Sequence, residues 1–307
     1  MNTVLQQDFR KFDQLDLLAR QVVEGFIIGL HKSPYHGFSV EFAEHRLYNQ
    51  GDTIRNVDWK VYGRTGKMYT KKYEEETNLR CQLVIDVSSS MRFPLQATKG
   101  QLNKLEFSAV ASAALMYMLK KQRDAAGLTL IGQDIKVHTL CKTNQQHHQL
   151  MMNYLYQELI QTNTLEKTAL AENLHKVAEM VHQRSLVIIF SDMLTDGGDP
   201  EALFSALQHL RHNKHEVVLF HVVDKAAELD FKFDNRPYEF VDLETGQSVK
   251  LLPAEVRDRY RKMAEATESA IKLKCAQYKI DVVETDIAKG YDDILQAYLL
   301  KRSRMKI

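Results

Sequence analysis

Five short runs of apolar residues, separated by helical patterns, constrain the fold of this chain more than any other feature. The runs span residues 83–87, 128–131, 186–190, 217–223 and 280–283. Continuous apolar runs of this length are typical of strands that are buried on both faces of a sheet. Because strands that alternate with helices usually form parallel sheets, this order predicts an α/β fold with a doubly wound, mostly parallel sheet.

The segments between these runs carry the apolar spacing of helices. Helical patterns cover residues 102–121, 168–182 and 200–211, and a proline near the first turn opens a long helix over residues 253–274. Residues 136–140 predict a short additional strand at the edge of the sheet. We therefore expect helices on both faces of one sheet.

The first 79 residues differ in character from the rest of the chain. Apolar residues recur at three- and four-residue steps from Leu15 to Leu30, which predicts an amphipathic helix. Residues 31–80 carry glycines between short segments, a pattern typical of turns and short strands. The sequence therefore predicts an N-terminal extension over residues 1–79 and an α/β domain over residues 80–307.

The overall charge excludes binding driven by a whole-molecule electric field. The 307 residues include 41 Lys and Arg against 40 Asp and Glu, a net charge of +1, so no general attraction to nucleic acid or an anionic membrane is expected.

The three cysteines show no C-x-x-C spacing, so neither a disulfide framework nor a thiolate zinc site is suggested. The amino terminus lacks a signal-peptide core, and no apolar stretch is long enough to insert into a membrane. We expect a cytoplasmic protein whose binding depends on a local site.

Oxygen-bearing side chains follow two of the apolar runs, where ligands bind in parallel sheets. The first run ends in a D-x-S-x-S turn containing Asp86, Ser88 and Ser90, and Asp192 directly follows the run 186–190. Thr168 begins a helix at the same predicted edge. Carboxylate and hydroxyl oxygens are ligands that Mg²⁺ prefers. Two carboxylates would balance the ion's charge and leave its octahedron incomplete, so an incoming carboxylate would suit it.

Other interpretations of these residues stay open. Thr164 is an alternative to Thr168, and Asp196 and Asp199 lie in the same loop as Asp192. Asp and Ser are also favoured in solvated turns and at helix N-caps, so the D-x-S-x-S turn has a purely structural interpretation.

The proposed ligand set resembles the metal-ion-dependent adhesion site (MIDAS) of von Willebrand factor A domains. The resemblance implies a Rossmann-like fold and assigns metal binding to Asp86, Ser88, Ser90, Thr168 and Asp192. It also implies that an acidic side chain of a partner protein supplies the last metal ligand.

A second resemblance covers nearly the whole chain. Residues 41–59, 64–69 and 74–76 look like the signature of the bacterial domain-of-unknown-function family fifty-eight, whose members join such an extension to a von Willebrand A-like domain. The genes of that family commonly neighbour a MoxR-type AAA+ ATPase. The resemblance implies an adaptor for such an ATPase or for a client protein.

Trp59, the only tryptophan, is expected to anchor a core.

The leading hypothesis is therefore a non-enzymatic interaction protein that binds a partner's carboxylate through Mg²⁺ or a similar cation. An alternative is a metal-dependent phosphohydrolase that uses Asp86 as nucleophile or ligand at the same sheet edge. A third possibility is a metal-free turn, with all docking performed by the Arg- and Glu-rich extension.

Overall fold

The computed structural model describes residues 12–32, 45–47, 59–71, 79–95, 101–161, 169–194 and 200–305. The chain divides into two compact units, one formed by Met1–Phe26 with Leu79–Lys306 and the other chiefly by Ile27–Asn78. The first unit contains the sheet and the candidate site.

A six-stranded sheet forms the centre of the first unit, in the order β10-β7-β6-β3-β4-β5. Its strands are β3 (Arg80–Asp86), β4 (Ala125–Ile131), β5 (Ile135–His138), β6 (Leu186–Ser191), β7 (Glu216–Val223) and β10 (Asp281–Asp286). All neighbouring strands pair in parallel except β5, which pairs antiparallel with β4 at the edge. The predicted mostly parallel α/β sheet and its short edge strand are confirmed.

The strand order reverses next to β3. From β3 the chain passes to β4 on one side, and it later returns to β6 on the other side of β3. In an open parallel sheet, such a reversal leaves a crevice outside the carboxyl ends of the two strands, where ligands bind. The loops that follow β3 and β6 therefore occupy the position of a ligand site.

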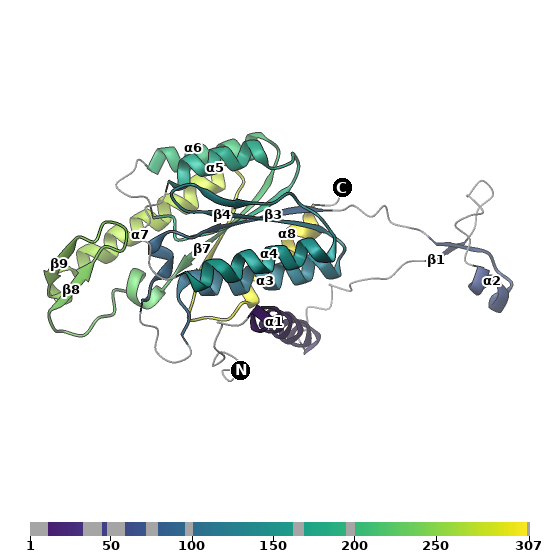
Figure 1. Ribbon diagram of the computed structural model, residues 1–307, viewed down its shortest axis with the longest axis horizontal. Helices are drawn as coiled ribbons and strands as arrows, with labels where there is room; N and C mark the ends of the chain where they lie inside the picture. Colours follow the sequence, from purple (N-terminus) through teal and green to yellow (C-terminus); the bar gives the residue numbers. More distant parts are fainter. Residues whose placement is uncertain are drawn as a thin grey trace. The chain divides into compact units, whose positions relative to one another are not determined.

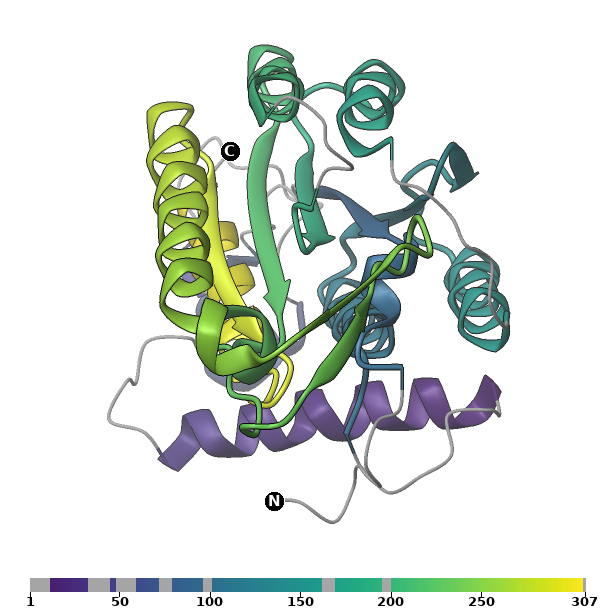
Figure 2. The same cartoon turned by 90° about the vertical axis from the view of Figure 1, so that its left-hand side faces the viewer.

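Helices cover both faces of the sheet (Figures 1 and 2). One face carries α5 (Leu170–Met180), α6 (Pro200–His212) and α7 (Pro253–Gln277), and the other carries α3 (Lys104–Lys121), α4 (Gln145–Ile160) and α8 (Asp292–Arg304). Strand residues such as Ile189 and Leu219 share one core with Leu207 of α6 and Ile271 of α7. Burial on both faces explains why the strands are continuously apolar.

The N-terminal helix α1 (Phe12–Lys32) carries the predicted apolar face. Leu15, Ala19 and Val23 are buried, and the Arg20 guanidinium lies 5.8 Å from the centre of the Tyr117 ring on α3. The first part of this helix thus belongs to the unit that contains the sheet.

A segment between β7 and α7 has a structure that the apolar pattern did not reveal. It forms the π-helix η4 (Lys225–Leu229) and a hairpin of β8 (Tyr238–Val241) and β9 (Ser248–Leu251). Phe231 stacks with Phe240 and contacts Tyr260 of α7, with ring centres 5.7 and 4.5 Å apart. These aromatic contacts hold the hairpin against α7.

The second unit contains β1 (His45–Leu47), α2 (Trp59–Thr65) and β2 (Tyr69–Lys71) among its described residues. The two strands pair antiparallel, as expected for short strands in this segment. The prediction for Trp59 is wrong, because its side chain is 56% exposed. It lies on a short helix and contacts the ring of Tyr62 edge-on, which leaves most of the indole outside any core.

Candidate functional site

Asp86 is the last residue of β3, next to β6 in the sheet, and its side chain is fully buried. Its Oδ1 accepts a hydrogen bond from the Ser88 backbone N–H at 3.0 Å, and its Oδ2 accepts one from the Ser191 hydroxyl at 2.8 Å. The chain then enters a short 3₁₀ helix, η3 (Ser89–Arg92). This turn brings the hydroxyls of Ser88 and Ser90 to 3.1 Å from each other.

Asp192 directly follows β6 and is buried beside Asp86. Its side chain is hydrogen-bonded to Ser90, and its Oδ1 accepts a hydrogen bond from the Leu194 backbone N–H at 3.2 Å. Met193, the next residue, has φ of 56°, in the left-handed region that non-glycine residues rarely adopt. Backbone held in such a conformation is common at ligand-binding sites, where surrounding contacts enforce it.

Lys104 reaches the same site from the start of α3. Its ammonium lies 2.7 Å from Asp192 Oδ2 and 2.5 Å from Glu228 Oε1 of η4. A capping box between Asn103 and Glu106 fixes the first turn of α3 and therefore the position of Lys104. The Lys104 side chain is completely buried, so these two carboxylates replace water as its partners.

The two aspartates of the site differ in whether a nearby cation compensates their charge. Burial, and then the neighbouring charge of Asp192, raise the pKa of Asp86 to about 6. Burial acts in the same direction on the pKa of Asp192, but Lys104 outweighs it and holds that pKa below its usual range. Burial alone would lower the pKa of Lys104, whereas Asp192 and Glu228 together raise it. Asp86 is therefore the carboxylate that lacks a cation.

Comparison with known families identifies the chain. Residues 44–270 match the family described as "Protein of unknown function DUF58". The chain belongs to the DUF58 family. Uncharacterized proteins from Mycobacterium bovis and Mycobacterium tuberculosis are 24% identical to it over 210 residues. That match covers 68% of this chain and 63% of each relative's length.

Solved structures give a weaker likeness to this DUF58 protein. BatB from Bacteroides thetaiotaomicron is 14% identical, with a TM-score of 0.43, over 74% of this chain and 98% of that one. An aerotolerance-related membrane protein from Bacteroides fragilis is 13% identical, with a TM-score of 0.41, over 74% and 100%. Among the helices described in the DUF58 protein, none has the length and apolar character needed to cross a bilayer.

Four of the five predicted ligands of the DUF58 protein lie together at the sheet edge. These are Asp86, Ser88, Ser90 and Asp192, linked directly or through one neighbour by hydrogen bonds and charge. The fifth, Thr168, and its alternative Thr164 lie outside the described residues, as do Asp196 and Asp199.

Three participants were missed by sequence reasoning. Ser191 carried a signal, because it ends the same strand that Asp192 follows. Lys104 carried another, because a cation in the first turn of an apolar helix opposes the helix dipole and needs a nearby anion. Glu228 carried none, since it lies in a π-helix between two predicted elements and reaches the site only through the tertiary fold.

The donor set of the DUF58 site fits a hard divalent cation. Two buried carboxylates and the hydroxyls of Ser88 and Ser90 supply oxygen ligands of the kind that Mg²⁺ selects, while the Ser191 hydroxyl donates to Asp86 and accepts from the Met193 N–H. Within the described residues there is no cluster of three or more His, Cys, Asp or Glu side chains suited to a metal. A site at Asp86 would therefore depend on hydroxyl oxygens as well as carboxylates.

Proposed function

We propose that this DUF58 protein is a metal-dependent protein–protein interaction module with a von Willebrand A-like domain. A divalent cation such as Mg²⁺ is held in a MIDAS-like site by Asp86, Ser88, Ser90, Asp192 and Thr168. The bound ion then takes an acidic side chain of a partner as its last ligand. The partner is a MoxR-type AAA+ ATPase or a client protein handled with it.

The observation that carries the proposal is the uncompensated charge of Asp86. Its carboxylate is fully buried next to Asp192, and no ammonium or guanidinium in the described part of the chain pairs with it. A buried carboxylate without a counter-ion is costly. A divalent cation between Asp86 and Asp192 would remove that cost, which is a reason for a protein to keep two such groups together.

The number of oxygen ligands supports a carboxylate as the incoming ligand. Lys104 cancels one of the three negative charges of Asp86, Asp192 and Glu228, and the two that remain match the two charges of Mg²⁺. Two carboxylates and three hydroxyls leave one position of an octahedral ion open. A partner's Asp or Glu would fill it with a strong, oriented bond, as hard cations favour charged oxygen ligands.

A binding measurement tests this function. The full-length protein and its Asp86→Ala variant are titrated with the MoxR-type ATPase of the same bacterium, each in Mg²⁺ and in chelator. We expect binding of the wild type in Mg²⁺ alone. Equal affinity in all four cases would disprove the metal mechanism, and binding lost in chelator but unchanged by Asp86→Ala would place the ion elsewhere.

A further inference from the structure

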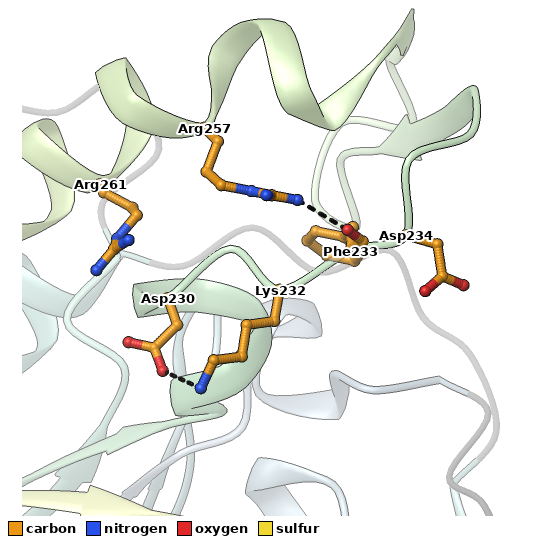
Figure 3. A pocket seen from close by; sticks show the side chains of 6 residues that line it. All are labelled: Asp230, Lys232, Phe233, Asp234, Arg257 and Arg261. Carbon is orange, nitrogen blue, oxygen red and sulfur yellow. Dashed lines mark hydrogen bonds and ion pairs between the residues drawn. The ribbon is translucent and has the colours of Figure 1, made fainter.

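A basic pocket lies between α7 and the loop that follows η4 (Figure 3). Its volume is about 560 Å³, which is within the usual range of sites for organic ligands and more than a single phosphate needs. Its lining consists of Asp230, Lys232, Phe233, Asp234, Arg257 and Arg261. We call it the arginine pocket.

The arginine pocket holds more positive than negative charge. Lys232 pairs with Asp230 at 2.7 Å, and Asp234 points away from the cations in Figure 3. Neither Arg257 nor Arg261 forms an ion pair within the described part of the chain. Lys232 and, less strongly, the charge of Arg261 lower the pKa of Asp230, so Arg261 has one nearby carboxylate but is not paired with it. Both guanidinium groups therefore keep hydrogen-bond donors for an anion.

Arg257 is held in place but only partly satisfied. One of its terminal nitrogens, Nη2, donates a hydrogen bond to the backbone carbonyl of Phe233 at 2.9 Å (Figure 3). Its Nε is buried and has no hydrogen-bond partner in the described structure. A buried N–H without a partner is costly, and a guanidinium fixed at one end is pre-oriented for a carboxylate.

The pocket adjoins the candidate metal site through η4. Glu228 of this π-helix holds Lys104, which in turn holds Asp192. Asp230 of the pocket is only two residues beyond Glu228, and its backbone N–H bonds to Lys225 of the same helix. Tyr260, next to Arg261 on α7, is close enough to Glu228 and Lys104 for their charges to act on its phenol. The contacts of η4 and the position of Tyr260 therefore link the arginine pocket to the candidate metal site.

We infer that the arginine pocket binds a second carboxylate of the acidic segment whose first carboxylate completes the metal site. This inference rests on the proposed function and specifies the partner as a segment with at least two acidic side chains. Arginine suits this role because its planar fork donates two parallel hydrogen bonds to a carboxylate. The pocket would select against partners that carry a single acidic residue.

The test uses fluorescein-labelled octa-aspartate as the probe and fluorescence anisotropy of the full-length protein as the readout. Octa-asparagine controls for the peptide backbone, and unlabelled inorganic phosphate controls for simple anions. The pocket variants are Arg261→Gln and Arg257→Gln. Arg259→Gln is the matched control, because Arg259 is exposed on the same helix and does not line the pocket. Thermal melting checks that each variant folds. If Arg257→Gln does not fold, Arg261→Gln alone tests the pocket, because Arg261 is exposed.

In Mg²⁺, each pocket variant should weaken octa-aspartate binding by about tenfold, the effect of losing a charge-assisted hydrogen bond worth about 1.4 kcal/mol. Arg259→Gln should leave the affinity within about twofold of wild type. Equal affinity of pocket and control variants would overturn the inference, as would no binding of octa-aspartate by the wild type. If inorganic phosphate displaced octa-aspartate at an equal concentration, the pocket would bind simple anions and the choice of an acidic segment as its ligand would be overturned.

Chelator separates this inference from the proposed function. Binding that needs Mg²⁺ but ignores both arginines would support the metal site and contradict the pocket's role. Binding that needs the arginines and ignores chelator would contradict the shared acidic segment and the metal mechanism together. Dependence on both supports the full inference.

Discussion

The Lys104 ammonium lies 2.7 Å from Oδ2 of Asp192, and both side chains are buried. A fixed cation therefore pairs with one of the two carboxylates of the proposed metal site, while Asp86 has none. Lys104 holds Asp192 in position before any ion binds, but its positive charge also opposes a divalent cation nearby. We therefore expect the pair to affect both the stability of the metal-free protein and the affinity of the proposed site for the ion.

Lys104→Met should destabilise the metal-free protein. Removal of one partner of a buried ion pair leaves Asp192 and Glu228 uncompensated, at a cost of about 3–5 kcal/mol. The variant should bind Mg²⁺ more tightly than the wild type, because the competing charge is gone. Chemical denaturation in chelator and in Mg²⁺ measures both effects.

The matched control for this prediction is Lys121→Met, at the exposed far end of α3. It should change the free energy of unfolding by less than about 1 kcal/mol and leave the response to Mg²⁺ intact. If Lys104→Met responds to Mg²⁺ no more than this control does, Lys104 and the ion do not share a site.

Asp86→Asn should stabilise the protein in chelator and abolish its response to Mg²⁺. Burial and Asp192 raise the pKa of Asp86 to about 6, so its charge is unfavourable in the folded state at neutral pH. The amide retains an acceptor for the Ser88 N–H and removes that charge, which outweighs the loss of the hydrogen bond that the Ser191 hydroxyl donates to Oδ2, for a net gain of about 1–2 kcal/mol. Differential scanning calorimetry should show a higher midpoint for the variant in chelator. A lower midpoint would mean that the Asp86 charge already has a counter-ion.

The sheet, and the position of Asp86 beside Asp192, follow from the local sequence pattern. The apolar runs that became β3 and β6 are buried on both faces, and Asp86 and Asp192 meet because these strands pair side by side. Local pattern did not reveal α4, since its sequence is rich in Gln and His and its buried face is formed by scattered residues such as Met151 and Leu155.

The rest of the site depends on contacts between residues far apart in the chain. Lys104 and Asp192 are separated by 88 positions, and Lys104 and Glu228 by 124. Periodicity reports which face of an element is buried and says nothing of which polar side chain on another element will meet it. A buried ion pair of this kind becomes visible only once the helices are placed on the sheet.

We expect the buried His215 to lower the free energy of unfolding in acid. Burial lowers the pKa of its imidazole below its usual range, so the unfolded chain binds this proton more tightly than the folded protein does. As the pH falls through about 6.5, the unfolded state gains protons first and the free energy of unfolding decreases.

His215→Asn should therefore lose less stability than the wild type between about pH 7.5 and pH 5.5. His212→Asn is the control, because His212 is exposed on the same segment, and it should follow the wild type. Urea denaturation at both pH values gives the comparison. Equal losses in the wild type and the His215 variant would remove this residue from the account of acid sensitivity.

Alanine variants decide between the two candidate threonines. Thr168→Ala should weaken Mg²⁺ binding by about tenfold, as expected for the loss of one ligand, and Thr164→Ala should not. Isothermal titration calorimetry of the two variants gives the answer. The reverse order of effects would assign the fifth ligand to Thr164.

The most direct test of the metal site is anomalous diffraction from crystals grown with Mn²⁺, a hard divalent cation with the same oxygen preference as Mg²⁺. A peak is predicted between the carboxylates of Asp86 and Asp192, in contact with the hydroxyls of Ser88 and Ser90. The peak should be absent from crystals of Asp86→Asn grown in the same solution. A wild-type map with no peak beside Asp86 would contradict the central claim.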